Sequence, residues 1–135
     1  MWLRIFRGLL TLLFQIMTRI NVGVRAKELT RQHLIAEHRE IKRIPNCIKK
    51  GRYNIENMPD QFKLGAGHVK FFYNKLQFLH NRYLEIYAEC IERGYNVTNY
   101  NDCFLGVPQQ LYNDYKPTAQ DRQLILDRIA EKLKK

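Results

Sequence analysis

The stretch HVKFFYNKLQFLHNRYLEIYAECIER, residues 68–93, decides the fold because it carries the strongest periodic pattern in the chain. Its apolar residues recur every three or four positions, which is the spacing of one face of an amphipathic helix. They are Val69, Phe72, Tyr73, Leu76, Leu79, Tyr83, Ile86, Tyr87 and Cys90. Gly94 follows as the expected C′ residue of this helix. We interpret the tyrosine-rich face as core packing rather than as a surface on which bases stack.

A second helix is expected before this stretch. Residues 24–41, VRAKELTRQHLIAEHREI, contain no glycine or proline and many good helix formers, and they predict a helix that ends before Pro45. Residues 47–64 are polar, with no clear period, and predict a loop with at most a short helical turn. The glycines of GAG at 65–67 then lead into the long helix.

A third helix is expected near the end of the chain. Residues 118–135 begin with Thr118 and Asp121 in capping-box spacing and continue with an amphipathic pattern. No run of alternating apolar residues is long enough to predict a strand. The sequence therefore predicts an all-α fold: a single compact domain of three main helices, with one long central helix.

The chain is strongly basic. Its 135 residues include 23 Lys and Arg against 13 Asp and Glu, a net charge of +10. Such an excess indicates a polyanionic partner, nucleic acid before an acidic membrane. The three cysteines have neither the spacing of a disulfide framework nor that of a zinc site, which favours a reducing compartment. We expect a cytoplasmic protein, in a bacterial cell or a virus-infected host cell.

Residues 1–16, MWLRIFRGLLTLLFQI, differ from the rest of the sequence. Their apolar run, 8–16, is shorter than the about 20 residues of a membrane-spanning helix, and no A-x-A cleavage pattern follows it. We expect translation to start at Met17, so that residues 1–16 are a start-site artefact or a pro-segment and residues 17–135 are the functional domain. The alternative is a targeting segment, or an interfacial helix that anchors an inactive domain to a membrane.

The expected helix at 24–41 carries the densest cluster of reactive side chains. His33 and His38 are five residues apart, roughly 140° around a helix, so they cannot bind one metal ion from one face. His33, Glu37 and Glu40 do share a face. The simpler interpretation is a solvated ion-pair surface. The functional interpretation is that nearby arginines neutralise phosphates while one carboxylate faces a reacting sugar.

Several segments in a fixed order carry a resemblance to a known family. They are MTRIN at 17–21, QHLIAEHRE at 32–40, Arg43, LGAGHVKFFYNKLQFL at 64–79 and AECIERGYN at 88–96. Together they resemble the pyrimidine dimer DNA glycosylases, the phage-type repair enzymes historically called endonuclease V. The resemblance runs from Met17 to about Lys132 and implies an all-α domain of three principal helices.

The resemblance also implies a chemistry. The family excises the 5′ base of a cyclobutane pyrimidine dimer and then nicks the abasic site by β-elimination, acting as DNA glycosylase and AP lyase. Its nucleophile, the α-amino group of a threonine exposed by methionine removal, matches Thr18, and its catalytic carboxylate matches Glu40. The positions that match its DNA-binding groups are Arg19, Gln32, His33, Arg39, Arg43, Arg128 and Lys132. The expected partner is damaged double-stranded DNA, bound by a monomer with no metal, no other cofactor and no stable membrane association.

Two features depart from the family pattern. His38 stands where the phage enzymes carry an aromatic residue, and the sequence ends at Lys135, short of the aromatic and basic tail that contributes to dimer recognition in those enzymes. A lyase acting mainly on abasic or other damaged sites is therefore one alternative. A non-catalytic basic helical protein that binds nucleic acid is another.

Overall fold

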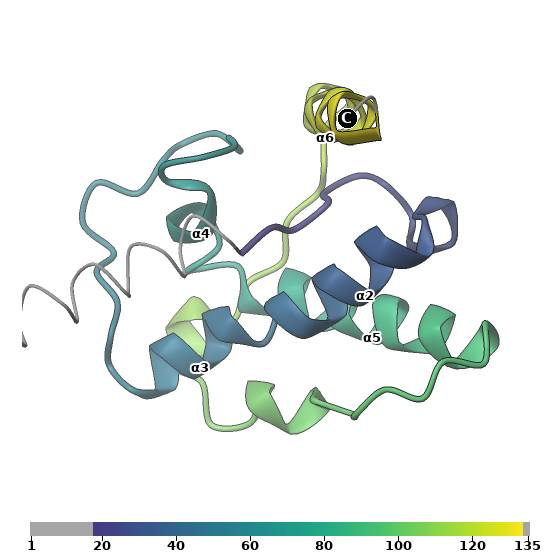
Figure 1. Cartoon of the computed structure of the whole chain (residues 1–135). Coiled ribbons are helices and arrows are strands. Elements are labelled where there is room, and N and C mark those ends of the chain that lie inside the picture. The colour runs from purple at the N-terminus through teal and green to yellow at the C-terminus, as the bar shows by residue number, and fades with distance from the viewer. Residues whose placement is uncertain (1–17, 134–135) are drawn as a thin grey trace, which may run out of the picture.

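A computed structural model describes residues 18–133 (Figure 1). The extension at 1–16, Met17 and residues 134–135 lie outside the described residues. The elements in chain order are η1 (Ala26–Glu28), α2 (Arg31–Glu40), α3 (Arg43–Lys49), α4 (His68–Phe71), α5 (Leu76–Glu92), η2 (Asn101–Phe104), η3 (Gln109–Leu111) and α6 (Ala119–Leu133). No strand occurs between residues 18 and 133, so the all-α prediction is confirmed.

Helix α5 is the long central helix, and its apolar face is the centre of the core. Leu76, Leu79, Tyr83 and Ile86 are fully buried, which confirms that the periodic face packs inward. Gly94 ends the helix with a φ of +79°. The Tyr95 N–H donates to the Cys90 carbonyl and the Gly94 N–H to the Ile91 carbonyl, which is the Schellman arrangement that favours glycine.

The long helix predicted over 68–93 is interrupted between α4 and α5. Phe71, Phe72 and Tyr73 are consecutive and all buried, which a single apolar face of a regular helix does not provide because neighbouring side chains point about 100° apart. The break turns all three rings into the core. Lys75 stabilises it, since its Nζ donates to the Phe71 carbonyl and to Asn74 Oδ1, both at 3.0 Å.

Helix α2 is shorter than predicted, because Thr30 is its N-cap and residues before it form η1 and extended chain. The predicted end of this helix before Pro45 is confirmed, since α2 ends at Glu40. A separate helix that the sequence did not predict, α3, begins at Arg43 and runs through Pro45 to Lys49. Proline is compatible with the first turn of a helix, where its missing N–H costs no hydrogen bond. Helix α2 packs along α5 in the lower layer of Figure 1.

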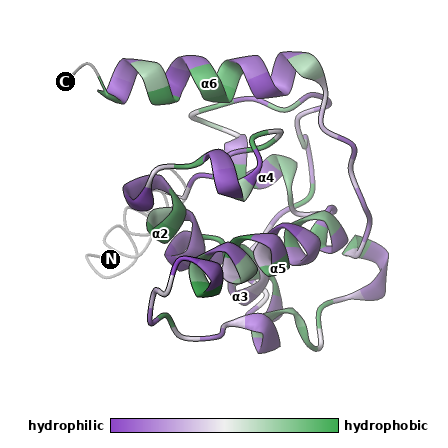
Figure 2. Ribbon diagram, turned by 90° about the vertical axis from the view of Figure 1, so that its right-hand side faces the viewer, coloured by the Kyte–Doolittle hydropathy of each residue, from purple (hydrophilic) through white to green (hydrophobic). Residues whose placement is uncertain are grey.

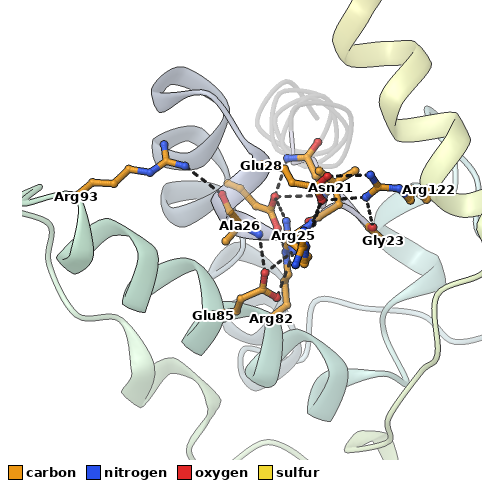
Figure 3. A network of polar contacts seen from close by, with 11 residues as sticks. Asn21, Gly23, Arg25, Ala26, Glu28, Arg82, Glu85, Arg93 and Arg122 are labelled. Atoms are coloured by element: carbon orange, nitrogen blue, oxygen red, sulfur yellow. Dashed lines mark hydrogen bonds and ion pairs between the residues drawn. The ribbon is translucent and has the colours of Figure 1, made fainter.

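Helix α6 crosses above the other helices (Figure 2) and begins with the predicted capping box. The Thr118 N–H donates to Asp121 Oδ2 and the Asp121 N–H to Thr118 Oγ1, both at 3.0 Å. Gly23 permits its close packing, because an added Cβ would lie 2.9 Å from Arg122 Cβ. Arg122 also donates to the Gly23 carbonyl and pairs with Glu28 (Figure 3).

Residues 19–29 have little regular structure but are held along their length by side chains from the helices. Arg82 donates to the Val24 carbonyl. Glu85 accepts the Ala26 N–H (Figure 3). Arg93 donates to three carbonyls between Ala26 and Leu29. This N-terminal segment therefore has a defined path between α6 and the lower layer. None of the helices within residues 18–133 has the length and apolar character needed to cross a membrane.

Candidate active site

A pocket of about 210 Å³ opens between the N-terminal segment, α2 and α6. Its lining is dominated by polar and charged side chains drawn from all three parts of the chain. They are Arg19, Asn21, Gln32, His33, Ala36, Glu37, Glu40, Arg128, Lys132 and Leu133. The structure thus brings together six of the nine residues to which the sequence assigned a site role, although they span 113 positions from Arg19 to Lys132.

Glu40 is held at the pocket by the main chain of the N-terminal segment. The Arg19 N–H donates to Glu40 Oε1 at 3.0 Å, and Arg39 Nη2 lies 3.6 Å from Oε2. Burial raises the pKa of Glu40, against the opposing effects of the Arg19 N–H and of Arg43 and Arg39. A carboxylate that is partly removed from water interacts strongly with a cation that forms beside it.

Thr18 is buried, with 2% of its surface exposed. Because the nitrogen of Arg19 is bonded to the carbonyl carbon of Thr18, the hydrogen bond to Glu40 places the Thr18 main chain beside that carboxylate. The two residues that the sequence matched to nucleophile and carboxylate, Thr18 and Glu40, are therefore neighbours across 22 positions of sequence.

Glu37 is a member of this site whose surroundings the sequence did not predict. It is fully buried rather than solvated, and its oxygens accept from Arg82 Nε at 2.6 Å and Nη2 at 3.0 Å. It also accepts the backbone N–H of Asn21 at 3.2 Å and the side-chain amide of Asn21 at 2.6 Å. The signal was present in the sequence, since Arg82 occupies the apolar face of α5 between Leu79 and Ile86, where a cation requires a buried anion.

Arg128 connects α6 to the N-terminal segment. Its Nη2 donates to Asn21 Oδ1 at 2.8 Å. Burial, with repulsion from Arg19, lowers the pKa of Arg128 to about 10, so it remains charged at neutral pH. The pKa of His33 is also lowered, by burial and by the charges of Arg128 and Arg19. The His33 ring is therefore mainly uncharged at neutral pH. The pocket wall therefore combines fixed positive charge with one neutral imidazole.

The comparison with protein families shows to which family this chain belongs. The model of the family described as pyrimidine dimer DNA glycosylase matches residues 17–101. This chain belongs to the pyrimidine dimer DNA glycosylase family. It is thus a DNA repair enzyme of the glycosylase class, whose substrate is damaged DNA. The match begins at Met17 and includes Thr18, the helices α2 to α5 and Glu40; α6, with Arg128 and Lys132, follows it.

Three residues with predicted site roles do not line the pocket of this glycosylase: Thr18, Arg39 and Arg43. Thr18 is buried and directly precedes Arg19, which does line the pocket. Arg39 is a mostly exposed side chain that pairs with Glu40, and Arg43 begins α3. Both arginines still act on the pocket, because their charges oppose the rise in the pKa of Glu40.

The two histidines of α2 have different surroundings, as their spacing predicted. His33 lines the pocket. His38 is buried, with Nε2 3.2 Å from the Tyr83 hydroxyl and its ring against Tyr87 and Tyr100. His38 therefore does not line the pocket. Within residues 18–133, no group of three or more His, Cys, Asp or Glu side chains is placed to hold a metal ion.

Proposed function

We propose that the α-amino group of Thr18 excises the 5′ base of cyclobutane pyrimidine dimers in DNA, and that the same covalent intermediate nicks the resulting abasic site by β-elimination. The observation that carries the proposal is the hydrogen bond from the Arg19 N–H to Glu40, beside a pocket lined by cations. This hydrogen bond joins Arg19, the residue after the proposed nucleophile, to Glu40, whose carboxylate can stabilise a cationic sugar. Family membership supports the excision step.

A chain terminus suits this chemistry. An α-amino group has an ordinary pKa of about 7.7–8.0, against about 10.4 for lysine, so a useful fraction is free amine at neutral pH. In a chain that continues upstream, the Thr18 nitrogen is an amide and is not nucleophilic. We therefore propose that the active form starts at Met17 and loses this methionine, and that residues 17–135 are the functional domain.

The reaction proceeds through an iminium. The amine lone pair bonds to C1′, the bond from C1′ to the base breaks, and the base leaves with a proton. Loss of a proton from the attacking nitrogen and opening of the sugar ring complete the iminium. Removal of a proton from C2′ then expels the 3′ phosphate, and water releases the enzyme. Glu40 stabilises the cationic sugar and the iminium and assists these proton transfers.

The remaining site residues bind the DNA. Arg19, Arg39, Arg43, Arg128 and Lys132 neutralise phosphates, which makes binding steeply dependent on salt. Gln32 and His33 contact the nucleotides beside the lesion from the pocket wall. Reaching C1′ requires a distorted duplex, and the cost of unstacking, about a few kcal/mol, is lowest where a lesion has already weakened the stack. We propose that the protein acts as a cytoplasmic monomer without metal or other cofactor.

Borohydride trapping tests this function. A duplex with one thymine dimer is incubated with protein started at Met17 and with protein started at Met1, and each N-terminus is read by mass spectrometry. We expect a covalent adduct only where Thr18 is N-terminal, and none in Glu40→Gln or after the amine is blocked. An adduct with an abasic duplex but none with the dimer would replace dimer excision by a lyase on other damaged sites. Absence of both adducts would leave a DNA-binding protein without this chemistry.

A further inference from the structure

Three consecutive backbone N–H groups of the N-terminal segment donate to side chains rather than to other backbone groups. The Arg19 N–H donates to Glu40 Oε1 at 3.0 Å, the Ile20 N–H to His68 Nε2 at 3.0 Å, and the Asn21 N–H to Glu37 Oε1 at 3.2 Å. Two of the acceptors come from α2, and the third is the first residue of α4. The segment is therefore held from two sides directly after Thr18.

The contacts of His68 require one form of its ring. The Ile20 N–H is a donor, so Nε2 must be the unprotonated acceptor, and Nδ1 must carry the proton that is donated to the Lys63 carbonyl at 2.8 Å. The ring is 3% exposed and packs edge to face with Phe62 and Phe72. Burial lowers the pKa of His68 to about 4, so the neutral ring is the form present at neutral pH.

The GAG sequence explains how this acceptor is built. Gly65 and Gly67 have φ angles of +71° and +89°, a conformation that other residues rarely adopt. At Gly67 a Cβ would also lie 3.1 Å from Pro59 Cγ and 3.3 Å from Lys63 Cδ. The turn that these glycines form brings the Lys63 carbonyl to Nδ1 and presents Nε2 to Ile20. The two glycines therefore allow the turn that positions the His68 ring.

We propose that His68 is a positioning residue for the reacting terminus. By holding the Ile20 N–H between the two carboxylate contacts, it restricts the direction in which the chain leaves Ile20 toward Thr18 and Glu40. The inference rests on the proposed role of the Thr18 amine. Effective attack requires reacting atoms within a near-attack geometry, and a misplacement of about 1 Å can cost about a hundredfold in rate.

Two variants of His68 separate the effect of its hydrogen-bond acceptor from the effect of its ring. Both are made in the protein started at Met17. His68→Gln keeps an acceptor that reaches the position of Nε2, whereas His68→Leu removes it. His80→Leu is the matched control, because His80 also has both ring nitrogens bound, to the Tyr112 hydroxyl and Asn101 Oδ1, and stacks on Phe104. These partners belong to η2 and to the residue that follows η3, and not to the N-terminal segment.

Three quantities are measured well below the melting temperature of every variant. They are the single-turnover rate of adduct formation at saturating abasic duplex, the Kd for a duplex with an unreactive abasic analogue, and the hydrogen-exchange rate of the Ile20 amide in the free protein. For His68→Leu we expect a rate lowered at least tenfold, a Kd changed less than twofold, and at least tenfold faster exchange at Ile20. His68→Gln should recover most of the rate, and His80→Leu should keep both the rate and the Ile20 protection.

A His68→Leu protein that reacts at the rate of the unsubstituted protein, or whose rate falls only as far as that of His80→Leu, would overturn the positioning role. An unsubstituted protein that forms no adduct while its Ile20 amide is protected through His68 would overturn the role of the Thr18 amine, and would leave His68 as a structural residue. The two failures are therefore distinguishable.

Discussion

Arg82 of α5 and Glu37 of α2 form a buried ion pair with two hydrogen bonds, at 2.6 Å and 3.0 Å, and Glu37 belongs to the lining of the pocket. Glu37 also holds Asn21, whose Oδ1 accepts from Arg128. The pair thus joins the core helix α5 to the N-terminal segment and, through Asn21, to α6. It ties the position of the site to the packing of the core.

Breaking this pair is expected to destabilise the protein strongly. Arg82→Leu leaves the Glu37 carboxylate buried without its cation, which typically costs about 3–5 kcal/mol. Urea unfolding measures the loss. Arg25→Leu is the control, because its pair with Glu28 is exposed and 3.7 Å long, and should cost less than about 1 kcal/mol. An Arg82→Leu protein as stable as Arg25→Leu would contradict this account. Combining Arg82→Leu with Glu37→Leu should recover part of the loss.

Glu40 is expected to oppose stability while it serves activity. Its pKa is raised in the folded protein, so folding favours the protonated form, and the unfavourable contribution is present above the folded pKa. It disappears as the pH falls through that pKa and then through the ordinary value of 4.5. Glu40→Gln should therefore melt at a higher temperature than the unsubstituted protein at pH 7, and the gap should shrink toward pH 4.

The same substitution should reduce catalysis by about a hundredfold or more, because it removes the anion that faces the cationic sugar. Two groups shape the acidic limb of the single-turnover pH profile: the Thr18 amine, which must be unprotonated to attack, and Glu40, whose pKa lies above 4.5. The step that Glu40 contributes should be missing from the profile of Glu40→Gln. An acidic limb unchanged in Glu40→Gln would assign it to another group.

Gly23 is expected to be required for the docking of α6. Gly23→Ala combines an unfavourable φ of +81° with a Cβ only 2.9 Å from Arg122 Cβ. Gly106→Ala is the matched control, since it has the same φ and no atom within 4 Å of the added Cβ. In both variants, backbone strain should lower the free energy of unfolding by about 1 kcal/mol. Only Gly23→Ala should also weaken DNA binding, because Arg128 and Lys132 move with α6. Equal DNA affinity of the two variants would show that α6 docks independently of Gly23.

Arg128 and Lys132 are expected to contact phosphates. Replacing either by alanine should lower the slope of log Kd against log salt concentration by about 1. Lys27→Ala is the control, because Lys27 is exposed beside Glu85, Glu89 and Glu92, where a phosphate would be repelled. Fluorescence anisotropy across a salt series gives the three slopes. A slope that falls equally in Lys27→Ala would indicate a loss of overall charge rather than of specific contacts.

The helices that sequence reasoning located well are those with complete local signals. The apolar face of α5, Gly94 at its end and the capping box of α6 are all set by residues a few positions apart. The errors have a common origin. The break before α5 follows from the burial of Phe71, Phe72 and Tyr73 together, and the late start of α2 follows from extended residues held by Arg93. Both depend on partners that local propensity does not include.

The sequence by itself determined the helical class, the net positive charge and the order of the family motifs, and it predicted the nucleophile and the carboxylate. Only the tertiary structure decided that Glu37 pairs with Arg82 across 45 positions, that His68 binds Ile20 across 48, and that α6 closes the pocket through a contact between Asn21 and Arg128 across 107. Periodicity reports which face of a helix is apolar, because that depends on neighbours within a turn. The choice of polar partner depends on which segments the core brings together, and on the cost of leaving a buried charge or donor without one.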